Sequence, residues 1–222
     1  MKGEMAIMLD DREIRILGCL IEKELTTPEY YPLSLNSLTN ACNKKSNRNP
    51  VISYDEAVVE QGLERLQSKG LVRKTLTAGS RVDKYLHTIL DKFDLSKQEM
   101  AILCELMLRG SQTAGEIRSR ADRMSPFETL DKAEEILQGL MDHDPALVIL
   151  LPREPGRKER RYTHLLSATG NIFAADADQP AAPSAPQVSA DERINRMEEE
   201  IAKLRNEIEE LKLALAEFRS QF

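Results

Sequence analysis

The stretch EIRILGCL at residues 13–20 decides the fold, because a related stretch, EMAILCEL, follows at residues 99–106. At one constant offset, a glutamate and three apolar residues are repeated: Glu13, Ile16, Leu17 and Leu20 are matched by Glu99, Ile102, Leu103 and Leu106. Apolar residues three and four positions apart are typical of one face of an α-helix. The sequence therefore predicts an internal repeat in which each copy begins with an amphipathic helix.

Two later series of residues keep the same order in both copies. The first series is Leu63, Leu66, Leu71 and Val72, which correspond to Leu137, Leu140, Leu147 and Val148 after two extra residues near position 143. The second series is Gly79, Tyr85 and His87, which correspond to Gly156, Tyr162 and His164. Chance could supply one such match but not an ordered series, so the repeat extends over a whole domain.

A second helix is predicted in each copy, at residues 34–43 and 113–122. The later of the two begins with Thr113 and Glu116, which are spaced as a capping box. A short helix of this kind can follow the first helix closely.

A third helix is predicted in each copy from a further capping box. These boxes are Ser53 with Glu56, and Ser125 with Glu128. In the second copy Pro126 would occupy the first helical position, where its missing N–H costs nothing.

A hairpin is predicted to close each copy. Gly70 is placed to end the third helix, and residues 71–76 and 81–89 follow as two strands. The second copy repeats these strands at residues 146–151 and 160–166. Three helices followed by a hairpin is the order of a winged helix, although a three-helix bundle with a decorative hairpin would give the same pattern.

We therefore expect a mainly α fold with small β-hairpins, built from tandem winged-helix domains and a C-terminal coiled-coil helix. The domains are expected at residues 1–92 and 93–167, followed by a flexible Ala/Pro linker at 168–190 and the coiled-coil dimerisation helix at 191–222. Because only a few residues separate the two copies, we expect the domains to pack against each other.

The composition restricts the functional classes. The 222 residues carry a net charge of -6 with a pI of about 5.3, so any contact with nucleic acid must be local. No apolar run reaches the roughly 20 residues of a membrane helix, and no signal-peptide core is present, which predicts a cytoplasmic protein without membrane contact.

Cys19, Cys42 and Cys104 lack metal-ligand spacing and are expected to be small buried thiols. Since common catalytic motifs are missing, we expect no metal, no cofactor and no enzymatic activity.

Two stretches resemble the YceH-like family of uncharacterised bacterial proteins. They are LGCLIEKELTTPEYYPLSLNSLTNACNKKSNRNP at residues 17–50 and LPREPGRKERRYTHLL at residues 151–166. The resemblance spans about residues 10–167 and implies a tandem winged-helix fold, but it implies no particular activity. This chain departs from the family pattern at Lys44 and Asn49, where Gln and an acidic residue are more usual, and the loop is therefore more basic here.

The first candidate for nucleic-acid contact is the loop at residues 43–50, before the third helix. Its candidate residues are Lys44, Lys45, Asn47 and Arg48. Cations bind phosphates, and amides can read base edges. The alternative, with equal support, is that the asparagines form turns and the cations are solvated.

The second candidate surface is the pair of hairpins. Its candidate residues are Arg73, Lys74, Arg81 and Lys84 in the first copy, and Arg153, Arg157, Lys158, Arg160 and Arg161 in the second. A wing that lies along a phosphate backbone needs such cations, and its binding should weaken as salt rises. A solvated charged hairpin is the alternative.

Carboxylates on the predicted third helices oppose an ordinary docking of these helices in the major groove. Their outward positions hold Asp55, Glu56, Glu60 and Glu64 in the first copy, and Glu128, Asp131, Glu134 and Glu135 in the second. These groups would repel phosphates, although some of them also complement the helix dipole.

The leading hypothesis is therefore a winged-helix transcriptional regulator that contacts double-stranded DNA mainly through its basic wings and the loop at residues 43–50. The alternative is a protein-interaction scaffold without DNA binding. In that reading another protein docks on the acidic third helices and on the aromatic loop at Tyr30 and Tyr31.

The last segment of the chain predicts a homodimer. Apolar residues recur there at alternating steps of three and four: Ile194, Met197, Ile201, Leu204, Ile208, Leu211, Leu215, Phe218 and Phe222. This heptad seam is typical of a parallel two-stranded coiled coil. The flanking charges would pair attractively between strands, as Arg193 with Glu198, Glu200 with Arg205, and Glu207 with Lys212. A helix that folds back on its own domains is the alternative.

Overall fold

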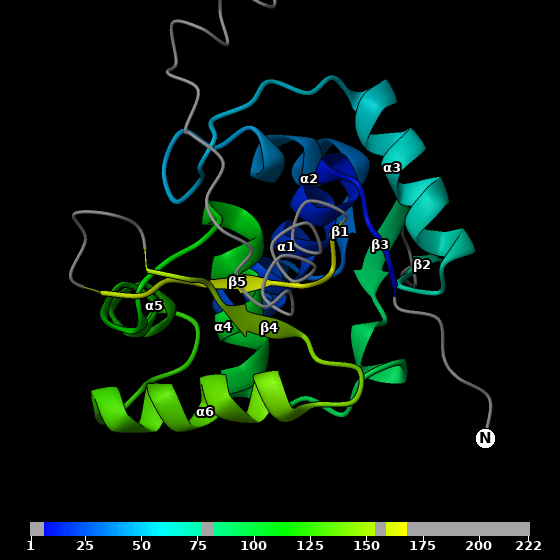
Figure 1. Cartoon of the computed structure of the whole chain (residues 1–222). Coiled ribbons are helices and arrows are strands. Elements are labelled where there is room, and N and C mark those ends of the chain that lie inside the picture. The colour runs from blue at the N-terminus through cyan, green and yellow to red at the C-terminus, as the bar shows by residue number, and fades with distance from the viewer. Residues whose placement is uncertain (1–6, 77–81, 154–158, 168–222) are drawn as a thin grey trace, which may run out of the picture. The chain divides into compact units, whose positions relative to one another are not determined.

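The computed structural model describes residues 7–76, 82–153 and 159–167 (Figure 1). Its first half contains α1 (Asp11–Thr26), η1 (Pro28–Tyr30), β1 (Leu33–Ser34), α2 (Leu35–Cys42), α3 (Glu56–Ser68), β2 (Val72–Leu76), β3 (Asp83–His87) and η2 (Ile89–Asp91), where η marks a short 3-10 helix. Its second half contains α4 (Lys97–Arg109), α5 (Ala114–Ala121), α6 (Leu130–Asp142), β4 (Val148–Leu150) and β5 (Tyr162–His164). The predicted order of three helices and a hairpin is present in both halves. The predicted linker and coiled coil lie outside the described residues.

The glutamates that open the sequence repeat, Glu13 and Glu99, complete capping boxes at the starts of α1 and α4. The Asp10 side chain accepts a hydrogen bond from the Glu13 backbone N–H at 2.8 Å, and Glu13 accepts one from the Asp10 N–H at 2.7 Å. Ser96 and Glu99 form the same arrangement in α4. Each box satisfies two backbone donors that have no partner within the helix, which explains why a glutamate recurs at this position.

The predicted start of the third helix is wrong in the first half. Helix α3 begins after Asp55, whose side chain accepts a hydrogen bond from the Val58 N–H at 2.8 Å, and not after Ser53. Asp55 is an equally good cap that lies two residues closer to the helix.

The predicted start is also wrong in the second half, where α6 begins after Thr129 and not after Ser125. The Asp122 side chain accepts a hydrogen bond from the Phe127 N–H at 3.1 Å, and the Phe127 side chain is buried. These contacts hold the intervening turn against the end of α5, so it cannot continue into α6. By contrast, the box of Thr113 with Glu116 opens α5 as predicted.

Each half ends in antiparallel strands with the same register. In the first half the sheet order is β1-β3-β2, and Val72 pairs with His87. In the second half β4 pairs with β5, and Val148 pairs with His164. Gly70 has a φ of 68°, in the left-handed region, and ends α3 as predicted. The strands β3 and β5 are shorter than the sequence indicated.

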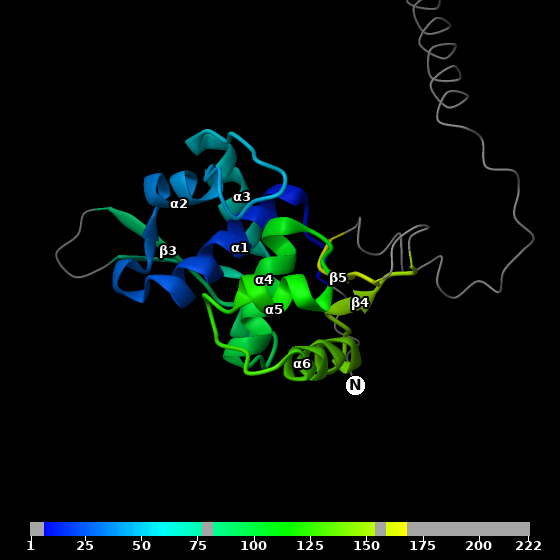
Figure 2. The ribbon, with the colours of Figure 1, turned by 90° about the vertical axis from the view of Figure 1, so that its left-hand side faces the viewer.

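Helices α1 and α4 pack against each other, so the two halves share one core (Figures 1 and 2). A Cβ on Gly18 would lie 3.0 Å from the Leu108 side chain, so a larger residue would require that side chain to shift. The repeated apolar residues of both helices are fully buried: Ile16, Leu17, Leu20, Ile102, Leu103 and Leu106. The three cysteines are buried free thiols, as predicted.

The two ends of the described fold are also joined. The Leu9 N–H donates a hydrogen bond to the Leu166 carbonyl at 2.8 Å, so the start of the first half is bound to the end of the second. None of the helices in the described ranges is both long and apolar enough to span a membrane.

Candidate functional site

The loop at residues 43–50 does not present Arg48 to solvent. The buried Arg48 guanidinium donates hydrogen bonds to both Glu22 carboxylate oxygens, at 2.6 and 3.1 Å, and to the Ala41 carbonyl at 2.9 Å. Burial alone would raise the pKa of Glu22, but hydrogen bonds from Arg48 and its charge lower the pKa overall. The expectation that Arg48 contacts a phosphate is therefore wrong, because a buried carboxylate already neutralises it. Among the other predicted cations of this loop, Lys45 is exposed and Lys44 is half-buried.

Asn47 and Asn49 connect the same loop to the second half. Asn47 has a φ of 58°, and its Oδ1 accepts a hydrogen bond from Arg109. The Asn49 N–H donates to the Leu108 carbonyl at 2.9 Å. The alternative that the asparagines serve local structure thus describes Asn47 better than a role in reading bases.

A buried ionic cluster next to Arg48 joins the two halves. Arg123, which follows α5, lies 2.8 Å from Glu22 in the first half and 2.7 Å from Glu105 in the second. Arg109 also contacts Glu105, at 3.1 Å. Glu22 and Glu105 are both fully buried. Breaking such buried pairs is costly, so the cluster fixes how the halves pack.

The first hairpin carries fewer uncompensated cations than its sequence indicated. Arg73 and Lys74 are exposed on β2, and Lys84 is half-buried on β3. Lys74 Nζ lies 2.6 Å from an Asp83 carboxylate oxygen, which compensates its charge. Arg81 lies outside the described residues.

The described cations of the second hairpin are of two kinds, those in an ion pair and those without one. Arg161 donates to the Ser111 carbonyl and to Glu116, both at 2.8 Å, so Glu116 compensates its charge, and its contact with DNA stays a prediction. Arg153 and Arg160 are exposed, and neither forms an ion pair within the described residues. Two further candidates lie outside the described residues: Arg157 and Lys158.

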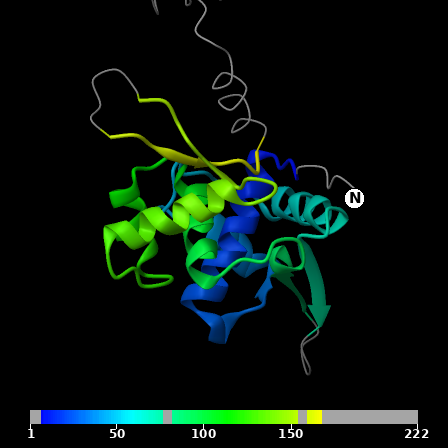
Figure 3. The same ribbon diagram turned by 60° about the horizontal axis from the view of Figure 1, so that its bottom comes forward.

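The hairpins lie on opposite sides of the described fold, with β2 and β3 on one side and β4 and β5 on the other (Figures 1, 2 and 3). The acidic residues predicted on the third helices are exposed, including Glu60 and Glu64 on α3 and Glu134 and Glu135 on α6. Because the hairpins lie on opposite sides, one protomer does not present them as one continuous surface.

The aromatic loop between α1 and α2 has one half-buried ring and one exposed ring. Tyr31 is half-buried, and its hydroxyl accepts a hydrogen bond from the His87 N–H at 2.6 Å. Tyr30 is 72% exposed. Tyr30 is therefore the more accessible ring of this loop for a partner.

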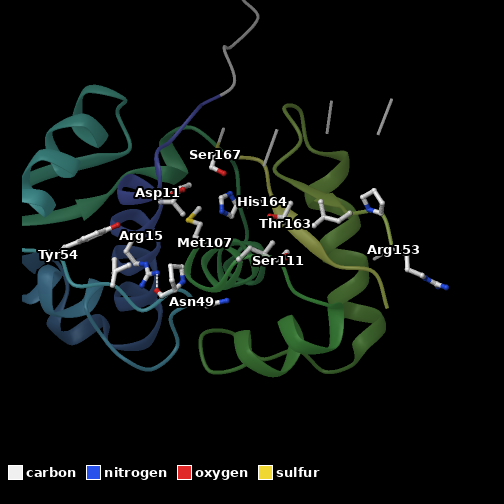
Figure 4. A pocket seen from close by; sticks show the side chains of 17 residues that line it. Asp11, Arg15, Asn49, Tyr54, Met107, Ser111, Arg153, Thr163, His164 and Ser167 are labelled. Carbon is white, nitrogen blue, oxygen red and sulfur yellow. Dashed lines mark hydrogen bonds between the residues drawn. The ribbon is translucent and has the colours of Figure 1, made fainter. Parts of the chain in front are cut away.

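A pocket of about 690 Å³ lies between the two halves (Figure 4). Apolar side chains from both halves form much of its wall: Ile14, Ile52, Leu106, Met107 and Leu151. A concave, mostly apolar site of this size is typical of small-molecule binding. The sequence does not predict this pocket, because residues of both copies form its wall.

Three buried polar residues line this pocket: Arg15 from α1, His164 from β5, and Ser167. Arg15 is 4% exposed, and burial lowers the pKa of its guanidinium. Burial also lowers the pKa of His164, to about 4, so its imidazole is neutral at pH 7. One sequence signal could have indicated Arg15: Ala101 stands at the corresponding position of the second copy.

Comparison with known proteins places the chain in a family. The family model described as "Protein of unknown function, DUF480" matches residues 9–157, which include most of both halves. A UPF0502 protein of Geotalea uraniireducens is 49% identical over 219 residues, which cover 98% of this chain and 100% of that relative. The chain belongs to the DUF480/UPF0502 family.

Other UPF0502 proteins are similar over comparable lengths. The one from Pelobacter propionicus is 48% identical over 223 residues, covering 98% of this chain and 100% of its own length. The one from Koribacter versatilis is 52% identical over 202 residues, covering 90% of this chain and 92% of its own length. This assignment agrees with the resemblance to an uncharacterised bacterial family found in the sequence. The similarity to UPF0502 proteins continues beyond residue 157, where the family model ends.

Proposed function

We propose that this DUF480/UPF0502 protein is a tandem winged-helix transcriptional regulator that binds double-stranded DNA, with the second hairpin as its main DNA contact. The observation that carries this proposal is the pair Arg153 and Arg160, which are exposed without an ion pair among the described residues. Arg157 and Lys158 stand between them in the sequence. Cations that no carboxylate neutralises can displace counterions from phosphates.

The distribution of charge supports a hairpin contact over a groove contact. In an ordinary winged helix the third helix enters the major groove. Here that helix would be α6, which exposes Glu134 and Glu135, and these would face phosphates at short range. The hairpin beside it exposes Arg153 and Arg160 instead.

A dimer would present two second hairpins to DNA, although the two hairpins of one protomer lie on opposite sides. One protomer has a single second hairpin, whereas a dimer offers two equivalent copies of it. We propose that the heptad seam at residues 194–222 forms this dimer, because two linked sites bind with a raised effective concentration.

Titration of a labelled random-sequence duplex over a salt series tests the DNA proposal. R153E/R160E should weaken binding at low salt by about tenfold or more, and should reduce the slope of log K against log salt by about two. K92E/K97E is the matched control, because it changes two exposed cations outside both hairpins and gives the same net charge. Equal weakening by both variants would contradict a hairpin contact.

Exposed acidic residues on α3 favour a second candidate, a protein-interaction scaffold. Glu60 and Glu64 are exposed and form no ion pair within the described part of the chain. If this face docks a protein, E60Q/E64Q should weaken recovery of that partner and leave DNA affinity unchanged. If the face lies near DNA, the same variant should strengthen non-specific DNA binding. Absence of DNA binding by the unmodified protein at low salt would favour the scaffold.

A further inference from the structure

We propose that the pocket between the two halves binds a small organic monocarboxylate with an apolar body, and that Arg15 holds the carboxylate. This inference does not rest on DNA binding. The pocket volume of about 690 Å³ falls within the roughly 300–1,000 Å³ of small-molecule sites.

Arg15 is a buried cation without a carboxylate partner. It is 4% exposed, and its guanidinium donates to two backbone carbonyls, those of Pro50 at 2.6 Å and Cys42 at 3.4 Å. No ion pair joins it to a carboxylate among the described residues. The contrast is Arg48 in the same half, which is equally buried but has the Glu22 carboxylate at 2.6 Å. A guanidinium buried without a counter-ion is unfavourable, so the Arg15 site lacks one negative charge.

A carboxylate is the group that best supplies this charge. A guanidinium has five N–H donors in a planar fork, and two carbonyl partners leave donors available. Carboxylates match this fork with two parallel hydrogen bonds. The neighbouring wall, which includes Ile14, Leu106 and Met107, would contact the rest of the ligand, so this remainder should be apolar.

His164 places a second buried polar side chain in the pocket wall, from the other half. It is 7% exposed, and its Nδ1 is buried without a hydrogen-bond partner in the described structure. Its counterpart in the repeat, His87, contacts Glu24 instead. A buried polar atom without a partner is uncommon in folded proteins, and a hydroxyl or carbonyl on the ligand would satisfy it.

The rim of the pocket restricts the charge of the ligand. Asp11 is exposed and lines the same pocket one helical turn before Arg15, yet no ion pair joins the two. Its carboxylate would repel a second negative charge. Arg153 is exposed and also lines the pocket, so the charges of Asp11 and Arg153 offset each other, and one carboxylate matches the remaining charge of Arg15.

Calorimetric titration of the full chain with octanoate and phenylacetate tests the proposal, with octanamide and phenylacetamide as neutral probes of the same shape. We expect millimolar or tighter affinity for at least one carboxylate, and binding about tenfold weaker for its amide. R15Q should remove this preference and leave amide binding unchanged. R12Q is the matched control, since Arg12 is an exposed cation on the same helix outside the pocket wall, and should behave as the unmodified chain.

A second variant, I52W, tests the pocket even if R15Q does not fold. I52W would fill the pocket from its wall, and should abolish binding of all four probes while circular dichroism shows an unchanged fold. Three results would overturn the proposal. They are equal affinity for acid and amide, full carboxylate preference in R15Q, and absence of saturable carboxylate binding at millimolar concentration. Loss of the preference in R153Q instead of R15Q would overturn the assignment of Arg15, because Arg153 also lines the pocket.

Discussion

Arg48 Nη2 lies 2.6 Å from Glu22 Oε2, and neither side chain is more than 1% exposed. R48A would leave the Glu22 carboxylate buried with Arg123 as its remaining cation. We expect the free energy of unfolding to fall by about 3 kcal/mol, measured by urea denaturation. The double variant E22L/R48M should recover most of this loss, because both buried charges are then removed together. An equal loss in both variants would show that packing, and not the unpaired charge, causes the effect.

The buried His164 should make stability depend on pH. Its folded-state pKa of about 4 lies below the usual 6.5, so the unfolded chain gains a proton before the folded chain does. The stability present above pH 6.5 should therefore fall as the pH falls toward 4, by about 3 kcal/mol in total. Urea midpoints between pH 7 and pH 5 would measure the effect while most carboxylates stay ionised. H164Q should have a flatter curve in this window, and an unchanged curve would refute the assignment.

Two single substitutions distinguish the observed cap of α3, Asp55, from the predicted cap, Ser53. D55A removes the acceptor for the Val58 N–H and should lower the free energy of unfolding by about 1 kcal/mol. S53A changes an exposed residue outside the helix and should have almost no effect. Thermal denaturation of both variants would measure the difference. A larger loss in S53A would restore the start expected from the sequence.

The heptad seam predicts the oligomeric state. The full chain should be a dimer by light scattering, and a chain ending at Ser167 should be a monomer, because it lacks residues 194–222. If DNA is bound, the shorter chain should also bind it more weakly. A dimer of the shorter chain would place the main dimer contact within the two halves, and a monomeric full chain would refute the prediction.

The sequence predicted best those features that nearby residues determine. The box of Thr113 with Glu116 and the helix stop at Gly70 depend on contacts within a few residues. The box predicted at Ser125 has the correct local pattern, but contacts of Asp122 with the Phe127 backbone override it. Local pattern therefore identified the helices more reliably than their first residues.

The candidate site was harder to predict, because exposure depends on residues far apart in the chain. A basic loop contains Arg48, but Glu22 on another helix neutralises it. Likewise, Glu116 on α5 neutralises Arg161 on the hairpin. Spacing within the sequence could not reveal either pair, since each depends on how separate elements pack.

The pocket also shows how the two copies differ. Arg15 comes from the first copy, and the second copy has Ala101 at the corresponding position. His164 comes from the second copy, and its counterpart His87 contacts Glu24 in the first. A single copy contributes only part of the pocket wall, so the whole pocket requires both copies. The pocket is therefore a consequence of the repeat, and the difference between Arg15 and Ala101 means that only the first copy supplies a cation at this position.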